Sequence, residues 1–431
     1  MEVNLSKNYG KKFFANKNDK TFFLFLGLAL WFAIPILGIF PLLFFVHLNQ
    51  KQDSKLNFII NLLVALTITT FVSSLDVISD LAVYTDNYEK LGKYNPFEIS
   101  GGRGVEFVMW VFSYPVYLIS NGSRYAFIFC CSLLFNILTF LVITKGFSPK
   151  NYGLLSLFIV SSPNFLGYQG FLVRQYLATV IFLVAVVNIE RKPLMWGIYL
   201  ISLCTHVGNL LYLPVLLLYD KTKLLKSNIV KILLVASGFA LTFSSSIVFN
   251  LASLIQRFLP SQYGSIILAK TFRYSREQAE SSDLGIAFVE HFIVFSLLII
   301  LVNTKSFNSS KEKLLYFLYP VFLFIMFIGR NIDLFSNRFA FILFPFSGLF
   351  YYFLIENKWK IFKREILTFL LIGKIIYFCY FLITIDRGDI AFNYMNNQAL
   401  TSNVFDYIEV VHNGFTEDIK IKDLPPNRYI D

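Results

Sequence analysis

Long apolar runs alternate with short polar breaks along most of the chain. A helix that spans the hydrocarbon core of a bilayer needs roughly 20 apolar residues, and runs rich in Phe, Leu and Ile repeatedly approach that length. The pattern predicts an all-α, polytopic transmembrane helical bundle with about 11–14 membrane segments, some of them broken or re-entrant. The apolar runs cover residues 22–48, 56–75, 105–120, 124–144, 152–168, 171–189, 194–218, 229–249, 284–303, 314–329, 338–355 and 365–385.

Lysine and arginine in the breaks orient the predicted helices. Short cytoplasmic loops carry an excess of these residues, so we assign the short basic breaks to the cytoplasm and the intervening breaks to the periplasm. The orientation predicts one integral membrane domain over residues 1–385, periplasmic loops at 76–123 and 250–283, and a periplasmic tail at 386–431. The cytoplasmic breaks hold Lys51, Lys55, Lys145, Lys150, Arg191, Lys192, Lys221, Lys223, Lys226, Lys305, Lys311, Lys313, Lys358, Lys360, Lys363 and Arg364.

Two apolar runs fit this orientation only if they do not cross as single helices. Run 105–120 carries Glu106 and Pro115, so we expect it to lie along the outer membrane surface. Run 194–218 has a polar interruption, and we expect it to enter and return as two half-length helices that turn near His206. Broken helices at membrane depth occur where they line a cavity.

The first apolar run leaves two interpretations open. The lysines before residue 22 favour a cytoplasmic N-terminus, yet a single crossing at 22–48 would put Lys51 outside. Either the run is a short hairpin bent at Pro35 and Pro41, or the charge rule fails for this segment.

Composition agrees with a membrane protein. Of the 431 residues, 56% are hydrophobic and 15% are charged, whereas soluble domains carry about 25% charged residues. We assign the net charge of +11 to loop lysines that face anionic lipid, because no basic stripe is long enough to follow a nucleic acid. The four cysteines lie inside apolar runs and the four histidines show no metal-ligand spacing, so we expect no metal and no cofactor.

The cations of the periplasmic breaks are mostly arginines. A planar guanidinium binds phosphate through two parallel hydrogen bonds, so an Arg-lined outer cavity predicts an anionic ligand such as a lipid-linked pyrophosphate. The alternative is that these residues are scattered interfacial anchors. The outer arginines are Arg103, Arg124, Arg174, Arg257, Arg273, Arg276, Arg330, Arg338 and Arg387.

Two candidate sites lie in the first periplasmic stretch. Asp80, Tyr84 and Tyr88 are spaced by four and share one helical face, which suits sugar binding or general-base catalysis; the alternative is a solvated helix start. A glycine-rich loop around Arg103 leads to Glu106. Its backbone N–H groups suit an anion, and the apolar setting of Glu106 suits proton transfer. The alternative for Glu106 is charge compensation at a helix N-terminus.

Arg174, Gln175 and His206 form the next group of candidates. Arg174 and Gln175 open a predicted membrane helix with no acidic residue nearby, and an Arg there is costly unless it is paired or faces a ligand. His206 lies at the predicted break, where we favour a functional role over ordinary packing.

The last candidates lie in two periplasmic loops. Arg330, Asp333 and Arg338 form a dense polar loop between two predicted crossings, and the alternative is a tight turn with a local ion pair. Arg273 and Arg276 lie in the longer loop before it, which is either a mobile lid or a solvated loop.

In their order along the chain, these residues resemble the EpsG-like branch of bacterial polysaccharide polymerases, relatives of the Wzy O-antigen polymerases. The resemblance covers most of residues 76–350. The chain departs from the family at Phe107, where Pro is frequent, and at Gly208, where Ser is frequent. The matching patterns are Asp80…Tyr84…Tyr88, Glu106 before an apolar helix, Leu172-Val-Arg174-Gln175-Tyr-Leu-Ala178, Thr205-His206-Val-Gly-Asn209 with Pro214, and Asn337-Arg338-Phe with Pro345.

The resemblance implies a GT-C-like fold and an inverting glycosyltransferase at the periplasmic face of the inner membrane. It implies undecaprenyl-pyrophosphate-linked oligosaccharides as donor and acceptor, membrane lipid as surroundings, and a chain-length regulator protein as an expected partner. The product is left open between O-antigen of lipopolysaccharide, capsule and exopolysaccharide. For this reaction we assign pyrophosphate binding to Arg174, Arg330 and Arg338, assistance to His206, the base to Asp80 or Glu106, and a sugar groove to Tyr84 and Tyr88. From the residue patterns above we add further substrate contacts at Arg103, Gln175, Arg273, Arg276 and Asp333.

Two other functions remain as alternatives. A flippase for lipid-linked oligosaccharide needs a pathway across the membrane and usually repeated halves, and the chain shows no internal repeat. An O-antigen ligase or similar transferase shares the Arg and His chemistry but presents one large late periplasmic loop, whereas loop 250–283 is of moderate length.

Overall fold

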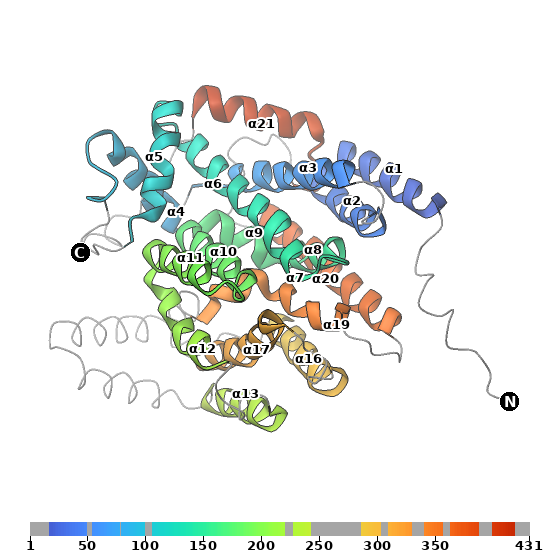
Figure 1. Cartoon of the computed structure of the whole chain (residues 1–431). Helices are drawn as coiled ribbons and strands as arrows, with labels where there is room; N and C mark the ends of the chain where they lie inside the picture. The colour runs from blue at the N-terminus through green and yellow to red at the C-terminus, as the bar shows by residue number, and fades with distance from the viewer. Residues whose placement is uncertain are drawn as a thin grey trace. The chain divides into compact units, whose positions relative to one another are not determined.

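The computed structural model describes residues 17–49, 54–77, 79–99, 106–219, 227–242, 286–302, 309–329, 340–356, 363–387 and 399–418. These residues form helices and contain no β-strand (Figure 1), which confirms the all-α class. The chain divides into two compact units. The first comprises Met1–Val173 with Thr368–Asp431, and the second comprises Arg174–Leu367.

The first unit is built from short and long helices. Its elements are α1 (Lys17–Ala33), α2 (Pro35–Asn49), α3 (Ser54–Ser73), α4 (Ser79–Glu89), η1 (Lys90–Gly92), α5 (Val108–Ser120), α6 (Arg124–Leu138), η2 (Thr139–Thr144), α7 (Lys145–Phe147), α8 (Tyr152–Val160), α9 (Pro163–Phe171), most of α20 (Lys363–Arg387) and α21 (Val404–Glu417).

The second unit contains the elements that follow α9 in the chain. They are α10 (Val173–Val187), α11 (Lys192–Thr205), η3 (Val207–Tyr212), α12 (Leu213–Leu218), α13 (Asn228–Thr242), α16 (Ile286–Leu301), α17 (Ser310–Gly329), η6 (Ala340–Tyr351) and α19 (Tyr352–Glu356).

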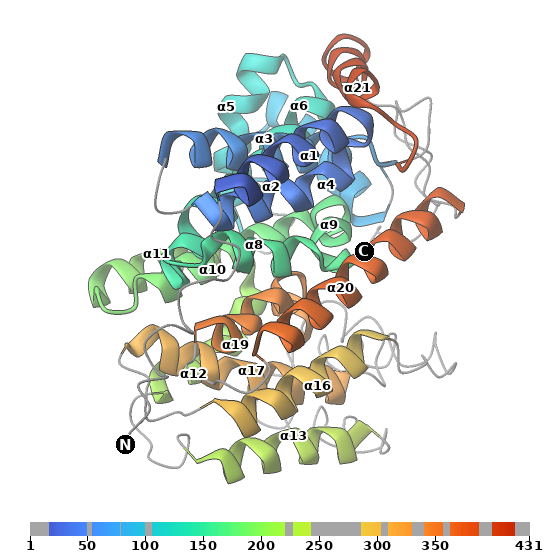
Figure 2. The same cartoon turned by 90° about the vertical axis from the view of Figure 1, so that its right-hand side faces the viewer.

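The first apolar run is an antiparallel helical hairpin. α1 and α2 lie side by side in both views (Figures 1 and 2), and the rings of Phe23 and Phe44 are 4.5 Å apart. Nearer the turn, Gly38 packs on the backbone of Trp31. The hairpin interpretation is therefore confirmed, with the bend at Ile34 and Pro35. Pro41 lies inside α2 and does not end it.

Three helical stretches among the described residues are long and apolar enough to cross a membrane. They are Ser54–Ser73, Arg124–Phe147 and Lys363–Thr384. The second stretch joins α6, η2 and α7 into one helix with a π-helical segment at Thr139–Thr144. Other apolar helices are shorter, including Val108–Ser120, whose 13 residues reach about 20 Å against a hydrocarbon core of about 30 Å. The complete set of crossings stays a prediction.

Two predicted helices are broken in the structure. Run 152–168 divides into α8 and α9 at Ser161 and Ser162. Pro163 begins α9, and proline has no N–H to continue the preceding helix. Within run 338–355, the described residues from Ala340 form the 3₁₀ helix η6, which contains Pro345 and a non-helical residue at Phe346. Proline again accounts for the break, because it removes a backbone donor inside the segment.

Amide and hydroxyl side chains join α3, α6 and α9 inside the first unit. Asn136 donates from Nδ2 to Thr69 Oγ1 over 3.2 Å and to Gln169 Oε1 over 3.1 Å. Gln169 donates back to Asn136 Oδ1 over 3.1 Å, and Ser132 Oγ donates to Gln169 Oε1 over 2.9 Å. Inside a bilayer the hydrophobic effect does not drive helices together, because lipid tails are as apolar as the helices. Hydrogen bonds of this kind help to hold membrane helices together.

We predict that Gly38→Ala destabilises the protein. A Cβ at Gly38 meets the backbone of Trp31, so α1 and α2 must separate, and overpacking of this kind costs about 1–3 kcal/mol. The control is Gly197→Ala in α11, where a Cβ meets nothing within 4 Å and Ala favours the helix by about 1 kcal/mol. The thermal unfolding midpoint in detergent should fall for the first variant only. Equal midpoints would contradict the close packing.

Candidate active site

The helices α10 and α11 form a second antiparallel hairpin, and its register is fixed by direct contacts. Ser202 Oγ donates to the carbonyl oxygen of Ala178 over 2.7 Å. Deeper in the hairpin, the rings of Phe182 and Tyr199 are 6.2 Å apart. In an antiparallel pair, each step toward the start of α10 is matched by a step toward the end of α11.

This register places Arg174 and His206 at the same level. Arg174 lies four residues before Ala178, and His206 lies four residues after Ser202. Four residues make about one helical turn, or about 6 Å, so both positions lie one turn beyond the contact between Ala178 and Ser202, toward the same end. The register therefore sets the backbone positions of these two candidates at the same end of the hairpin, within one unit.

His206 ends α11 and starts a return of the chain. Its backbone is extended, with φ −155° and ψ 120°, and the 3₁₀ helix η3 follows. Tyr199 OH then donates to the carbonyl oxygen of Asn209 over 2.9 Å, and the ring of Tyr212 stacks on Phe182 at 4.8 Å. Residues after the break thus lie beside earlier parts of the hairpin, which confirms the predicted turn near His206.

Asn209 fixes the returning chain to both helices. Its Nδ2 donates to the carbonyl oxygen of Ala178 over 2.9 Å and also to Ser202 Oγ. Asn209 is fully buried, and its Oδ1 has no hydrogen-bond partner among the described residues. The break at His206 is thus positioned by polar contacts one turn away from it.

The side chains at the end of this hairpin are mostly buried. His206 is 7% exposed and Gln175 is 8% exposed, whereas Arg174 is half-buried. The ring of Tyr176 lies 5.1 Å from that of Phe346, so η6 packs against the start of α10. A guanidinium and an imidazole in a partly dry setting can stabilise an anion strongly. In the described part of the chain, no cluster of three or more His, Cys, Asp or Glu side chains could hold a metal ion.

The first-unit candidates lie on α4 and just before α5. Asp80 is in the first turn of α4, and Tyr84 is 6% exposed. Glu106 is fully buried and directly precedes Phe107, the N-cap of α5. A buried carboxyl at the start of a helix is available for proton transfer only if a substrate reaches it. The catalytic roles of Asp80 and Glu106 stay predictions.

Tyr88 is a packed residue in this structure. It is fully buried, its ring stacks on Phe127 at 4.6 Å, and its hydroxyl lies 3.2 Å from Ser120 Oγ. Burial raises the pKa of Tyr88 to about 12, so the phenol stays protonated at neutral pH. These contacts describe a core position, and the predicted sugar contact of Tyr88 stays a prediction.

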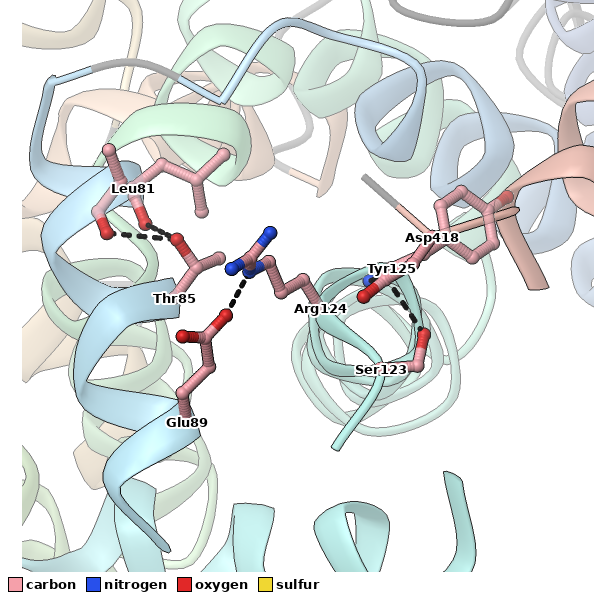
Figure 3. A network of polar contacts seen from close by, with 8 residues as sticks. Leu81, Thr85, Glu89, Ser123, Arg124, Tyr125 and Asp418 are labelled. Atoms are coloured by element: carbon pink, nitrogen blue, oxygen red, sulfur yellow. Dashed lines mark hydrogen bonds and ion pairs between the residues drawn. The ribbon is translucent and has the colours of Figure 1, made fainter. Parts of the chain in front are cut away.

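Arg124, one of the outer arginines, is paired within the protein. Its Nε donates to Glu89 Oε1 at the end of α4 (Figure 3). On the same α6 end, Asp418 Oδ1 accepts from the backbone N of Tyr125 over 3.0 Å and from Ser123 Oγ over 3.2 Å. Arg124 therefore joins two helices, and its charge is compensated without a ligand.

Several candidates lie outside the described residues, and their roles stay predictions. They are Arg103, Arg273, Arg276, Arg330, Asp333 and Arg338.

Sequence reasoning missed a polar cluster in the second unit. Tyr351 OH donates to Glu290 Oε1 over 2.8 Å. Tyr319 OH donates to the carbonyl oxygen of His291 over 3.0 Å and lies 3.3 Å from its Nδ1. Glu290 and His291 lie in the apolar run 284–303, and ionisable residues inside such a run were the available signal.

A comparison with models of protein families shows the family of this chain. The model described as the EpsG family matches residues 62–398, well over half of the 431 residues. The chain belongs to the EpsG family. The match contains Asp80, Glu106, Arg174 and His206 and confirms the resemblance drawn from the sequence patterns. No curated protein and no solved structure matches the chain.

Membership of the EpsG family, together with the apolar helices, makes the chain a membrane protein of polysaccharide biosynthesis. Within the described residues, the α10–α11 hairpin carries both a cationic candidate, Arg174, and a titratable one, His206.

We predict that cysteines placed at Arg174 and His206 can be cross-linked. The variant Arg174→Cys with His206→Cys, built without the four native cysteines, should react with a bifunctional reagent of about 5 Å because one helical register joins the two positions. The control Arg174→Cys with Ile198→Cys separates the thiols by two further turns, about 12 Å. Mass spectrometry of the digested protein detects the linked peptides. Linkage in the control alone would refute the register.

Proposed function

We propose that this EpsG-family chain is a polysaccharide polymerase. It acts as an inverting glycosyltransferase that joins undecaprenyl-pyrophosphate-linked oligosaccharide repeat units at the periplasmic face of the inner membrane. Family membership supports the general process. The observation that supports the specific proposal is the α10–α11 register, which sets Arg174 and His206 at one level beside the break that follows α11.

The reaction requires charge stabilisation on the leaving group. A hydroxyl oxygen of the acceptor sugar attacks the anomeric carbon of the donor and forms the new glycosidic bond. The bond between that carbon and the pyrophosphate oxygen breaks, and the lipid pyrophosphate leaves with the electron pair. Arg174 binds the developing negative charge through two N–H donors. His206 donates a hydrogen bond to the same group, and Arg330 and Arg338 are assigned to it as well.

The attacking hydroxyl must also lose a proton. A carboxylate is the natural acceptor, and Asp80 and Glu106 are the two candidates in the periplasmic stretch. General-base catalysis contributes typically about 10²–10⁴-fold to such steps. One displacement at the anomeric carbon inverts its configuration, because the nucleophile enters opposite the leaving pyrophosphate.

We expect Arg174→Ala to abolish chain growth. Loss of one preorganised donor to developing negative charge costs about 10²–10³-fold in rate. A deletion strain that carries this variant should make single repeat units at normal protein levels, read on a polysaccharide gel. Arg191→Ala is the matched control, since Arg191 is exposed at the opposite end of the same hairpin. Wild-type ladders from Arg174→Ala would count against the assignment.

The same gel separates the polymerase from the alternatives. Deletion of a polymerase gene leaves single repeat units on the final acceptor. Deletion of a flippase gene removes surface sugar, and deletion of a ligase gene leaves long chains on the carrier lipid. Either of the last two patterns would replace the polymerase proposal.

Substitution of the two carboxylates should identify the base. We expect one of Asp80→Asn and Glu106→Gln to lower polymerisation by about 10²-fold or more, while the other retains most activity. Asp86→Asn is the control, because Asp86 lies on the same helix and forms an exposed ion pair with Lys90. The rate is measured with purified protein and a synthetic lipid-linked repeat unit. Full activity in both variants would exclude a carboxylate base at these positions.

A further inference from the structure

The helix α21 has three different faces rather than two. Val404, Tyr407, Val410 and Gly414 are buried against the first unit. A second strip is apolar and exposed, with Phe405 at 63%, Ile408 at 60% and Phe415 at 49%. On a helix these three residues lie on one side, about 20–100° around the axis from Val404.

The third face of α21 is polar. It carries the exposed Glu409, Thr416 and Glu417 and the half-buried Asn413. His412 lies within the apolar strip, and its imidazole has an apolar body with a polar edge. A helix on a soluble protein needs one apolar face toward the core and one polar face toward water. The exposed apolar strip fits neither the protein core nor water, and it therefore needs a further apolar environment.

Contacts at both ends hold α21 in a fixed position. At its start, Asn403 and Asp406 form a capping box, and Phe405 lies edge-on to Phe32 of α1 at 5.5 Å. At its end, Asp418 accepts hydrogen bonds from the start of α6 (Figure 3). Phe415 packs on Tyr125 with their rings 5.0 Å apart. The apolar strip is therefore presented at a defined place on the protein.

Two neighbours relate this place to the membrane. The first is α6, whose Arg124 begins a stretch that is long and apolar enough to cross a bilayer; Asp418 bonds to residues at this boundary. The second is α1, which exposes Phe22, Phe25, Leu28 and Phe32 along one side. The contact between Phe32 and Phe405 makes the strip on α21 continuous with that exposed side.

We propose that α21 lies in the bilayer interface, with Phe405, Ile408 and Phe415 inserted among lipid acyl chains. Its buried face contacts the first unit, its apolar strip contacts lipid, and its polar face contacts water. Interfacial helices use this combination of aromatic or aliphatic residues and charge. The inference depends on the protein being in a membrane and is independent of glycosyl transfer.

Site-directed spin labels test this arrangement. Single cysteines replace Phe405, Ile408 or Phe415, and the matched controls replace Glu409, Asn413 or Thr416 on the polar face, all without the native cysteines. The full chain is placed in phospholipid nanodiscs with one copy per disc. Oxygen concentrates in the hydrocarbon and a nickel chelate stays in water, so collision rates report the surroundings of each label.

The expected result is a clear separation between the two sets. Labels on the apolar strip should collide with oxygen at several times the rate of their collisions with the nickel chelate, and the control labels should show the reverse. High nickel collision rates at all positions would overturn the proposal, because the strip would then face water. Immobile labels shielded from both reagents would also overturn it, since they would indicate a protein surface against the strip.

The unmodified chain provides an independent test. Nanodiscs containing a phospholipid with a diazirine on its acyl chain are irradiated, and the lipid adducts are located by mass spectrometry. Adducts on Phe405, Ile408 or Phe415, and not on Glu409 or Asn413, are expected. Adducts on α1 without any on α21 would refute insertion even if the labelled variants failed to fold.

Discussion

The candidate site depends on one backbone oxygen, the carbonyl of Ala178. Ser202 Oγ and Asn209 Nδ2 both donate to it, over 2.7 Å and 2.9 Å. Ser202 belongs to the helix before the break and Asn209 to the segment after it, so both arms of the broken segment bind the same point on α10. In a membrane, unsatisfied backbone groups cost several kcal/mol. These two contacts hold both arms of the broken segment against α10, and Tyr199 OH satisfies the backbone carbonyl of Asn209 just after the break.

The proposed chemistry of the site depends on this contact. With Ala178 and Ser202 at one level, Arg174 and His206 lie together one turn beyond it. A guanidinium held by its helix needs little reorganisation to bind a diphosphate, and such preorganised charge is usually the largest single contribution to catalysis of this kind. Arg124 also carries a guanidinium, but the carboxylate of Glu89 forms an ion pair with it and balances its charge. An arginine is therefore a candidate for diphosphate binding because of its surroundings in the fold, and its location in a predicted periplasmic break is not enough.

Local features of the structure were predictable from the sequence, and long-range contacts were not. Pro35 supported the hairpin as one of two interpretations, and the polar stretch at His206 predicted the break, because proline and polar residues inside apolar runs act on their own backbone. The ordered motifs were enough to identify the family. The bonds of Asp418 to Ser123 and Tyr125 join residues almost 300 positions apart, and no local pattern indicates such a partner. Glu290 and His291 were overlooked because the apolar residues around them far outnumber these two ionisable side chains.

Binding of undecaprenyl pyrophosphate to the purified chain in nanodiscs tests whether Arg174 and His206 form a diphosphate site. We expect the wild type to bind this lipid more tightly than undecaprenyl monophosphate. Arg174→Gln and His206→Gln should each weaken binding by about tenfold or more, since a hydrogen bond to a charged group contributes about 1.5–3 kcal/mol. Arg191→Gln should bind as the wild type does. Equal affinity of all four proteins for the pyrophosphate would show that Arg174 and His206 do not bind it.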